Sequence, residues 1–145
     1  MALTTITSTN SIFTLVVPGL IAIPVQLFGY SADKMFDTDA IELAETNMGV
    51  DGRMTAGYTP NPVKQTITLQ ADSPSKTVFS IIVQGMKTAR EIFYITGNIV
   101  LPSTGEVFSL TRGVLTSAKQ IPDAHKVLQP VDYVITWESI NRSLL

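Results

Sequence analysis

The stretch "GYTPNPVKQTITLQADSPSKTVFSIIVQG" (residues 57–85) carries the strongest architectural signal in the chain. After its two prolines, residues 63–71 alternate between apolar and polar side chains, which is the period of a strand with one buried face. From Val78 onward the apolar residues recur at intervals of three and four, the period of an amphipathic helix. We therefore predict a strand over residues 63–71 and one helix over residues 74–89.

The segment between this strand and the helix predicts where the helix begins. Asp72 or Ser73 is a suitable N-cap, because its side-chain oxygen can accept a hydrogen bond from a free backbone N–H of the first turn. Pro74 then falls in the first turn, where its missing N–H removes no helical hydrogen bond. In the strand, Val63, Ile67 and Leu69 are expected to face the core.

The rest of the chain reads as strands separated by turns, without a repeat, a linker or a low-complexity tract. The predicted strands cover residues 12–17, 21–30, 41–44, 92–101, 106–116 and 131–140. The expected fold is an α+β, β-rich single domain over residues 1–145: a small antiparallel β-barrel or sandwich with one flanking helix. Residues 1–10 are expected to form an N-terminal arm.

Residues 45–62, "ETNMGVDGRMTAGYTPNP", are the least regular part of the sequence. We interpret them as a long interaction loop, because loops of this length in compact domains are usually functional or mobile. An ordinary flexible β-hairpin tip is the alternative. Methionine and tyrosine are adaptable contact residues, and the predicted inter-subunit contacts are Met48, Val50, Arg53, Met54 and Tyr58.

The composition excludes several classes of function. Charged residues are 15% of the chain, the net charge is −2 and there is no basic run, which argues against non-specific binding to a phosphate backbone. The absence of cysteine removes disulfides, thiolate catalysis and cysteine-based zinc sites. The low charge is compatible with buried self-contact, and equally with a soluble β domain rich in threonine and serine.

Two segments could be mistaken for membrane or secretion signals. Residues 11–30 are long enough for a membrane span, but Pro18, Pro24 and Gln26 favour two buried strands with a turn between them. The first ten residues carry no positive charge before the first apolar run, which makes a poor signal peptide. We expect no membrane partner.

No arrangement of residues indicates catalysis, a metal site or a cofactor. His125 could pair with Asp123, but no nucleophile is positioned beside them. Asp33, Asp37 and Asp39 lack the spacing of a calcium loop, and the glycines of residues 49–57 lack the pattern of a phosphate loop. We therefore expect a protein that is not an enzyme.

The segment "NPVKQTITLQADSPS" followed by an apolar helix resembles the tail tube proteins of contractile-tailed bacteriophages, including those that start the tube on the baseplate. The positions that carry the resemblance are Thr66–Gln70, Ala71–Ser75 and Val78–Met86, and the likeness is firmest over residues 50–100. Such chains have a similar length, lack cysteine and place one helix in mid-chain between strands.

This resemblance implies a structural virion protein. Six copies would form a ring in which their sheets join into a continuous β-barrel around a channel, and stacked rings would form the tube through which DNA leaves without specific binding. The partners would be other copies, tail sheath proteins and baseplate proteins. The protein would be made in the host cytoplasm and located in the virion tail. Candidate channel-facing residues are Lys64, Thr66, Thr68 and Gln70.

A second hypothesis is a β-sandwich module of a virion or cell surface that binds carbohydrates or receptors. It would place exposed aromatic residues on loops, whereas Phe93, Phe108, Tyr133 and Trp137 fall in predicted strands. The third hypothesis, an enzyme with a scattered site, would depend on His125 and Asp123.

Overall fold

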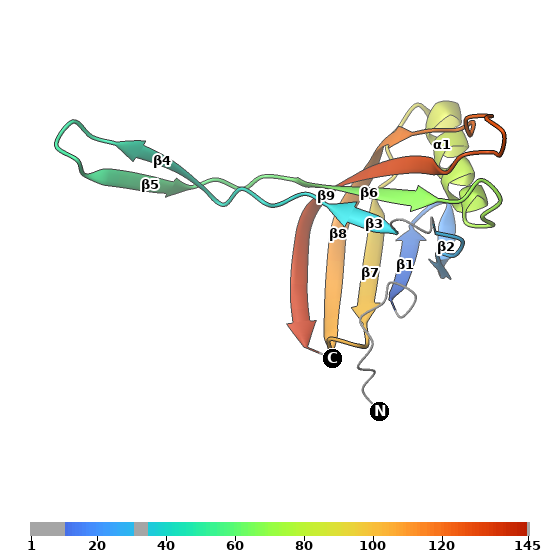
Figure 1. Ribbon diagram of the computed structural model, residues 1–145, viewed down its shortest axis with the longest axis horizontal. Helices are drawn as coiled ribbons and strands as arrows, with labels where there is room; N and C mark the ends of the chain where they lie inside the picture. Colours follow the sequence, from blue (N-terminus) through green and yellow to red (C-terminus); the bar gives the residue numbers. More distant parts are fainter. Residues whose placement is uncertain (1–10, 31–34, 145) are drawn as a thin grey trace.

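The computed structural model describes residues 11–30 and 35–144. It contains nine strands and one helix within this part of the chain, which confirms the β-rich α+β class (Figure 1). The elements are β1 (Ile12–Val17), β2 (Ile21–Gln26), β3 (Phe36–Thr38), β4 (Ala44–Met48), β5 (Met54–Tyr58), β6 (Val63–Leu69), α1 (Lys76–Ala89), β7 (Ile95–Leu101), β8 (Glu106–Ala118) and β9 (Val131–Leu144). The predicted arm over residues 1–10 lies outside the described residues.

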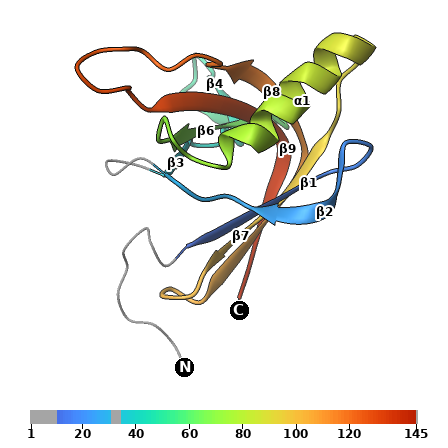
Figure 2. The ribbon, with the colours of Figure 1, turned by 90° about the vertical axis from the view of Figure 1, so that its right-hand side faces the viewer.

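Seven of the strands form one antiparallel sheet in the order β2-β1-β7-β8-β9-β6-β3. The remaining two, β4 and β5, form a separate hairpin. The large sheet is open, since β2 and β3 are its edge strands and do not pair with each other in the described part of the chain. The described part of the chain therefore forms a curled, open sheet with a flanking helix and no closed barrel (Figure 2).

The helix α1 packs on one face of the sheet and builds the core there. Phe79 of α1 stacks on Tyr133 of β9, with ring centroids 4.2 Å apart and an interplanar angle of 10°. Ile82, one turn further on, is also fully buried. The sequence placed Val63, Ile67 and Leu69 of β6 on the core face, and all three are buried.

Trp137 of β9 lies against two glycines of the neighbouring strands. Added Cβ atoms would meet its ring at 2.4 Å from Gly113 of β8 and at 3.0 Å from Gly97 of β7. The indole is fully buried, so the absent side chains on β7 and β8 provide the space in which it fits.

The helix begins later than its predicted cap, and the N-cap prediction was wrong. Ser75 is the N-cap residue and makes no side-chain cap bond. Its Oγ instead accepts the N–H of Phe28 at 2.6 Å, and Ser73 Oγ donates to the Phe28 carbonyl at 2.5 Å. The serines of "DSPS" fasten the loop after β2 to the start of α1, a long-range contact that local capping rules do not anticipate.

Several strand boundaries also differ from the prediction. The expected strand over residues 41–44 is absent except for Ala44, while β3 at Phe36–Thr38 was missed. The strand expected over residues 21–30 ends at Gln26, and β9 continues to Leu144. β3 forms because it pairs with β6, Phe36 opposite Ile67, and such pairing depends on residues far apart in the sequence.

Candidate functional site

The hairpin of β4 and β5 stands away from the body of the molecule (Figure 1). Its ladder runs from Ala44 opposite Tyr58 to Met48 opposite Met54, and every residue of both strands is exposed. The predicted long loop over residues 45–62 is therefore mainly a two-stranded ribbon, and its role in contacts between copies stays a prediction. An isolated two-stranded hairpin is marginally stable in water, so this one gains little stability from its own chain.

The tip of the hairpin, residues 48–54, has a defined backbone and exposed apolar side chains. The N–H of Gly49 donates to the carbonyl of Arg53 at 2.8 Å, and the N–H of Gly52 donates to that of Gly49 at 3.0 Å. Gly52 has a φ of 82°, a conformation that favours glycine. Four of the predicted contact residues are largely exposed: Met48, Val50, Met54 and Tyr58. Arg53 is exposed as well.

The strand β9 has an unpaired edge along its second half. β6 pairs with β9 only over Val131–Trp137, whereas β8 pairs with β9 as far as Leu144. Residues 138–144 thus have a strand on one side only, within the described residues. At the β2 end of the sheet, β1 is the one strand that pairs with β2 among residues 11–30 and 35–144. Free edges of this kind are templates for pairing with another chain.

The face of the sheet opposite the core carries an uncharged polar row across four strands. Thr14 of β1 lies opposite Asn98 of β7, Asn98 opposite Ser109 of β8, and Ser109 opposite Asn141 of β9. Asn98, Ser109 and Asn141 are exposed. The residues directly before and after Asn98 and Ser109 belong to the core side, which follows from the alternation of side chains along a strand.

Lys64, Thr66, Thr68 and Gln70, the predicted channel-facing residues, lie at the β6 end of the same sheet face. Lys64 and Gln70 are exposed and Thr66 is half-buried. Thr68 is buried, and its Oγ1 donates to Asp132 Oδ1 of β9 at 2.8 Å. In a single copy, Lys64, Thr66 and Gln70 are therefore accessible from this face and Thr68 is not.

An ion pair and a cation–π contact lie where β8 and β9 bend. Arg112 Nη1 is 3.4 Å from Glu138 Oε2, and the side chains of both residues are mostly exposed. The Arg112 guanidinium carbon lies 4.4 Å from the centre of the Tyr94 ring. Arg112 has a φ of 46°, so this basic residue is placed on the outer surface by a local irregularity of β8 that the sequence pattern did not reveal.

Asp123 and His125, the residues that could suggest chemistry, lie near enough for the charge of His125 to contribute to the lowered pKa of Asp123. Asp123 pairs with Lys119 at 2.6 Å, and this hydrogen bond lowers the pKa of Asp123. Asp33 lies outside the described residues. Within the described ranges, 11–30 and 35–144, no three histidine, aspartate or glutamate side chains form a group that could hold a metal ion. Among the same residues, no helix has the length and apolar character to cross a membrane.

Solved structures with the same fold come from contractile injection systems. The chain matches a component of the anti-feeding prophage cap, which terminates the tube, with a TM-score of 0.61 and 12% identity over 97% of this chain and 92% of that one. It matches a chain of the six-fold symmetrised anti-feeding prophage baseplate with a TM-score of 0.59 and 7% identity, over 92% of both chains. A chain of the PVC sheath-tube complex in the extended state gives a TM-score of 0.57 and 10% identity, over 92% of this chain and 88% of that one.

These identities are low, so the structural matches concern the fold, and at that level they confirm the resemblance to proteins of contractile tails. No curated protein matches the sequence. A family model described as tail fiber protein gp32 matches residues 4–141. The chain belongs to this tail fiber protein gp32 family, and its fold is that of baseplate, tube and cap components of contractile injection systems.

Proposed function

We propose that the chain is a structural subunit of a bacteriophage contractile tail, which self-assembles into hexameric rings of the tube or of its start on the baseplate. The observation that carries this proposal is the open sheet, whose β9 edge is unpaired over residues 138–144. The fold likeness to tube and cap components supports it. The six-fold symmetry of one matched baseplate supports a ring number of six.

Ring closure would satisfy the free edges of the sheet. The β9 edge of one copy would pair with the β1–β2 end of the next, a head-to-tail contact that closes when the rotation between copies is an integral fraction of a turn. The sheets would then join into one barrel in which the β9 and β2 edges are paired, while β3 would remain an edge strand. The single domain over residues 1–145 would be the repeating unit.

The sheet face opposite the core would line the channel. The row of Thr14, Asn98, Ser109 and Asn141 has no charge, and Lys64, Thr66, Thr68 and Gln70 would continue it along β6. A wall with few cations holds few phosphates, so DNA would pass through it without specific binding. The opposite side of the ring and the exposed hairpins would meet other copies, sheath proteins and baseplate proteins.

In this assembly the β4–β5 hairpin would contact a neighbouring copy through Met48, Val50, Arg53, Met54 and Tyr58. The protein would be made in the host cytoplasm and act in the virion tail. It would have no catalytic role and need no cofactor.

Electron microscopy and sedimentation velocity of the purified protein test the proposal. The expected result is rings or short tubes with a central hole at high protein concentration. The double variant Met48→Glu/Met54→Glu should reduce assembly by about tenfold or more, because charges at a desolvated contact weaken it. Asn47→Glu/Thr55→Glu, which adds the same charge at the adjacent exposed pair of the hairpin, is the matched control. Protein that stays monomeric at all concentrations would contradict the proposal.

A second candidate is a binding module of the tail that recognises a carbohydrate or a receptor, and the name of the family, tail fiber protein, favours it. This function would require the monomer, or a small oligomer, to bind surface glycans or host-cell envelopes. A glycan array and a cell-adsorption assay separate the two candidates. Binding by a protein that forms no rings would support the second candidate and reject the first.

A further inference from the structure

A pocket of about 290 Å³ lies on the core side of the sheet, beyond the region that α1 covers. Residues of five strands line it, among them Phe36 of β3, Gln65 of β6, Leu101 of β7, Phe108 of β8 and Ile140 of β9. Phe36, Leu101, Phe108 and Ile140 are only partly buried, so apolar surface is open to solvent there. The volume is at the small end of ligand pockets and suits one or two side chains.

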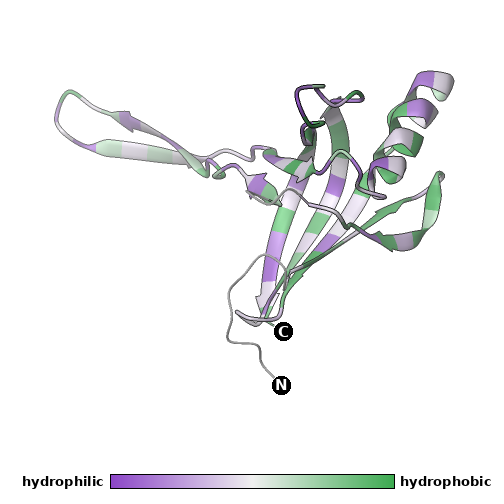
Figure 3. Ribbon diagram, turned by 45° about the vertical axis from the view of Figure 1, so that its right-hand side comes forward, coloured by the Kyte–Doolittle hydropathy of each residue, from purple (hydrophilic) through white to green (hydrophobic). Residues whose placement is uncertain are grey.

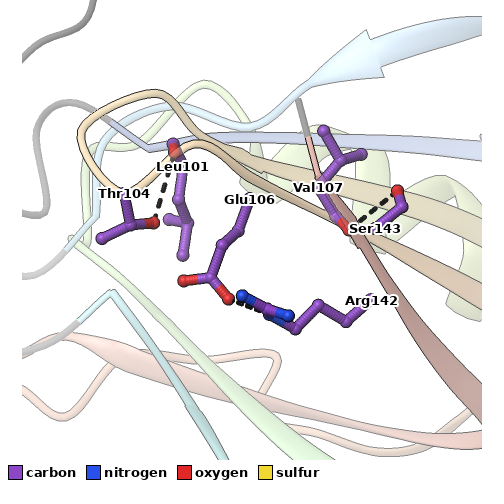
Figure 4. A network of polar contacts seen from close by, with 6 residues as sticks. All are labelled: Leu101, Thr104, Glu106, Val107, Arg142 and Ser143. Carbon is purple, nitrogen blue, oxygen red and sulfur yellow. Dashed lines mark hydrogen bonds and ion pairs between the residues drawn. The ribbon is translucent and has the colours of Figure 1, made fainter.

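The pocket exists because β8 and β9 are longer than the rest of the core. They have 13 and 14 residues and extend past α1 towards the C-terminal end (Figure 1). On this extension the core-side residues have no helix above them. Near the end of the sheet, Glu106 forms an ion pair with Arg142, which lies opposite Phe108 in the β8–β9 register (Figure 4). The extension of β8 and β9 beyond α1 thus has an apolar surface that is bordered by the side chains of Glu106 and Arg142.

Gln65 gives this pocket an unused hydrogen-bond donor. Its side chain is fully buried, and its Oε1 accepts the indole N–H of Trp137 at 2.9 Å. Its Nε2 finds no partner among the described residues. A buried N–H group without an acceptor costs about 1–3 kcal/mol. An occupant of the pocket with a carbonyl oxygen would remove this cost.

We propose that the pocket receives the tip of the β4–β5 hairpin of a second copy. This inference rests on the proposed self-assembly and identifies the surface that the hairpin meets. Val50 and Met54 would fill the apolar space, and a carbonyl of the tip would accept the Nε2–H of Gln65.

Three features of the tip fit the pocket. Its apolar side chains are exposed, and Val50 is completely so. The backbone bonds within the tip use the carbonyls of Gly49 and Arg53, which leaves that of Val50 available. Asp51 and Arg53 follow Val50 in the tip, so an acidic and a basic side chain of the tip can approach the Arg142–Glu106 ion pair at the border of the pocket.

The tip of a copy cannot occupy the pocket of the same copy. The hairpin extends away from the body, and both views that show its length place the tip far from the sheet (Figures 1 and 3). The hydropathy colouring shows hydrophobic residues in the hairpin although no part of the described chain covers them (Figure 3). The contact is therefore between copies, and it is heterologous, as a ring or a stack of rings requires.

Disulfide trapping tests this contact directly, because the native sequence has no cysteine. Chains carrying only Val50→Cys are mixed with chains carrying only Ile140→Cys, assembled and oxidised, and the linked peptides are identified by mass spectrometry. A disulfide requires the two Cα atoms to approach within about 7 Å. The matched control replaces Ile140→Cys by Ser109→Cys, which lies on the opposite face of the sheet.

The expected result is a 50–140 disulfide at a yield about tenfold above the 50–109 control, as for a contact favoured by about 1.4 kcal/mol. Rings in the micrographs with equal yields for both pairs would overturn the inference and leave the proposed function standing. Absence of rings would overturn both. A disulfide between Leu3→Cys and Ile140→Cys, without one at 50–140, would assign the pocket to the N-terminal segment and also overturn the inference.

Discussion

The indole N–H of Trp137 donates to Gln65 Oε1 at 2.9 Å, and both side chains are fully buried. This bond links the side chains of β9 and β6 on the core face. The two strands also pair along their backbones. It explains why a polar residue occupies the apolar side of β6, since a buried indole N–H needs an acceptor. The same glutamine lines the apolar pocket, so one residue connects the core to the proposed contact between copies.

Gln65→Leu is expected to destabilise the fold by about 1 kcal/mol or less, because leaving the Trp137 N–H buried without an acceptor is partly offset by removal of the unpaired Gln65 Nε2–H. Chemical denaturation followed by far-UV circular dichroism measures this change, because Trp137 is the one tryptophan of the chain and is replaced in part of the series. The double variant Gln65→Leu/Trp137→Phe should be less destabilised than the sum of its two single variants, since neither partner then remains unpaired. Strict additivity would mean that the hydrogen bond contributes nothing to stability.

Gly113→Ala is expected to destabilise the fold by about 1–3 kcal/mol through overpacking. A Cβ at this position would lie 2.4 Å from the rigid Trp137 ring and 2.9 Å from the Cγ2 atom of Ile135. Gly57→Ala is the control, because a Cβ there meets no atom within 4 Å. Thermal unfolding followed by circular dichroism should show a lower Tm for the first variant and little change for the second. Equal Tm values would contradict the proposed role of the glycine.

The sequence predicted those parts of the fold that depend on local periodicity. The alternation over residues 63–69 and the helical spacing after Val78 both describe faces that the structure buries. The sequence did not predict β3, which exists through its pairing with β6, or the use of Ser73 and Ser75 to hold the loop at Phe28. These contacts join residues far apart along the chain, and no local pattern encodes them.

The candidate assembly surfaces were predicted unevenly for the same reason. The unusual composition of residues 45–62 indicated an interaction segment. The two strands in it were not predicted, because their small and polar residues show no alternation of apolar and polar side chains. The row of Thr14, Asn98, Ser109 and Asn141 depends on the register of four strands, and the pocket beside Gln65 depends on five. Register is a tertiary property, so the sequence alone could not bring these residues together.

Tyr30 is expected to make the fold sensitive to alkaline pH. Burial raises the pKa of Tyr30 above its ordinary value of 10.0, and its hydroxyl has no partner among the described residues. A pKa raised in the folded state gives stability that is present below pH 10 and is lost as the pH rises above it, because the unfolded state ionises first. Tyr30→Phe should therefore reduce the loss of stability above about pH 10.

The same variant should leave stability at pH 7 unchanged or raise it by about 1 kcal/mol, since it removes an unpaired buried hydroxyl. Urea titrations at neutral and alkaline pH measure both effects, with Tyr58→Phe on the exposed hairpin as the control. A large loss of stability at pH 7 would mean that the hydroxyl has a partner in the folded protein.

The hydrogen bond between Lys119 and Asp123 is expected to lower the pH at which Asp123 ionises. Both residues lie in the loop before β9. The hydrogen bond from Lys119 lowers the pKa of Asp123, so the interaction is present above the ordinary pKa of an aspartate and is lost as the pH falls through the lowered value. Carboxyl NMR titration should find Asp123 ionising at a lower pH than an ordinary aspartate. Lys119→Met should move the Asp123 midpoint up towards the ordinary value.

His125→Gln should have the smaller effect, because the charge of His125 is the least of the causes that lower this pKa. A midpoint that moves with His125 and not with Lys119 would assign the pairing to the histidine.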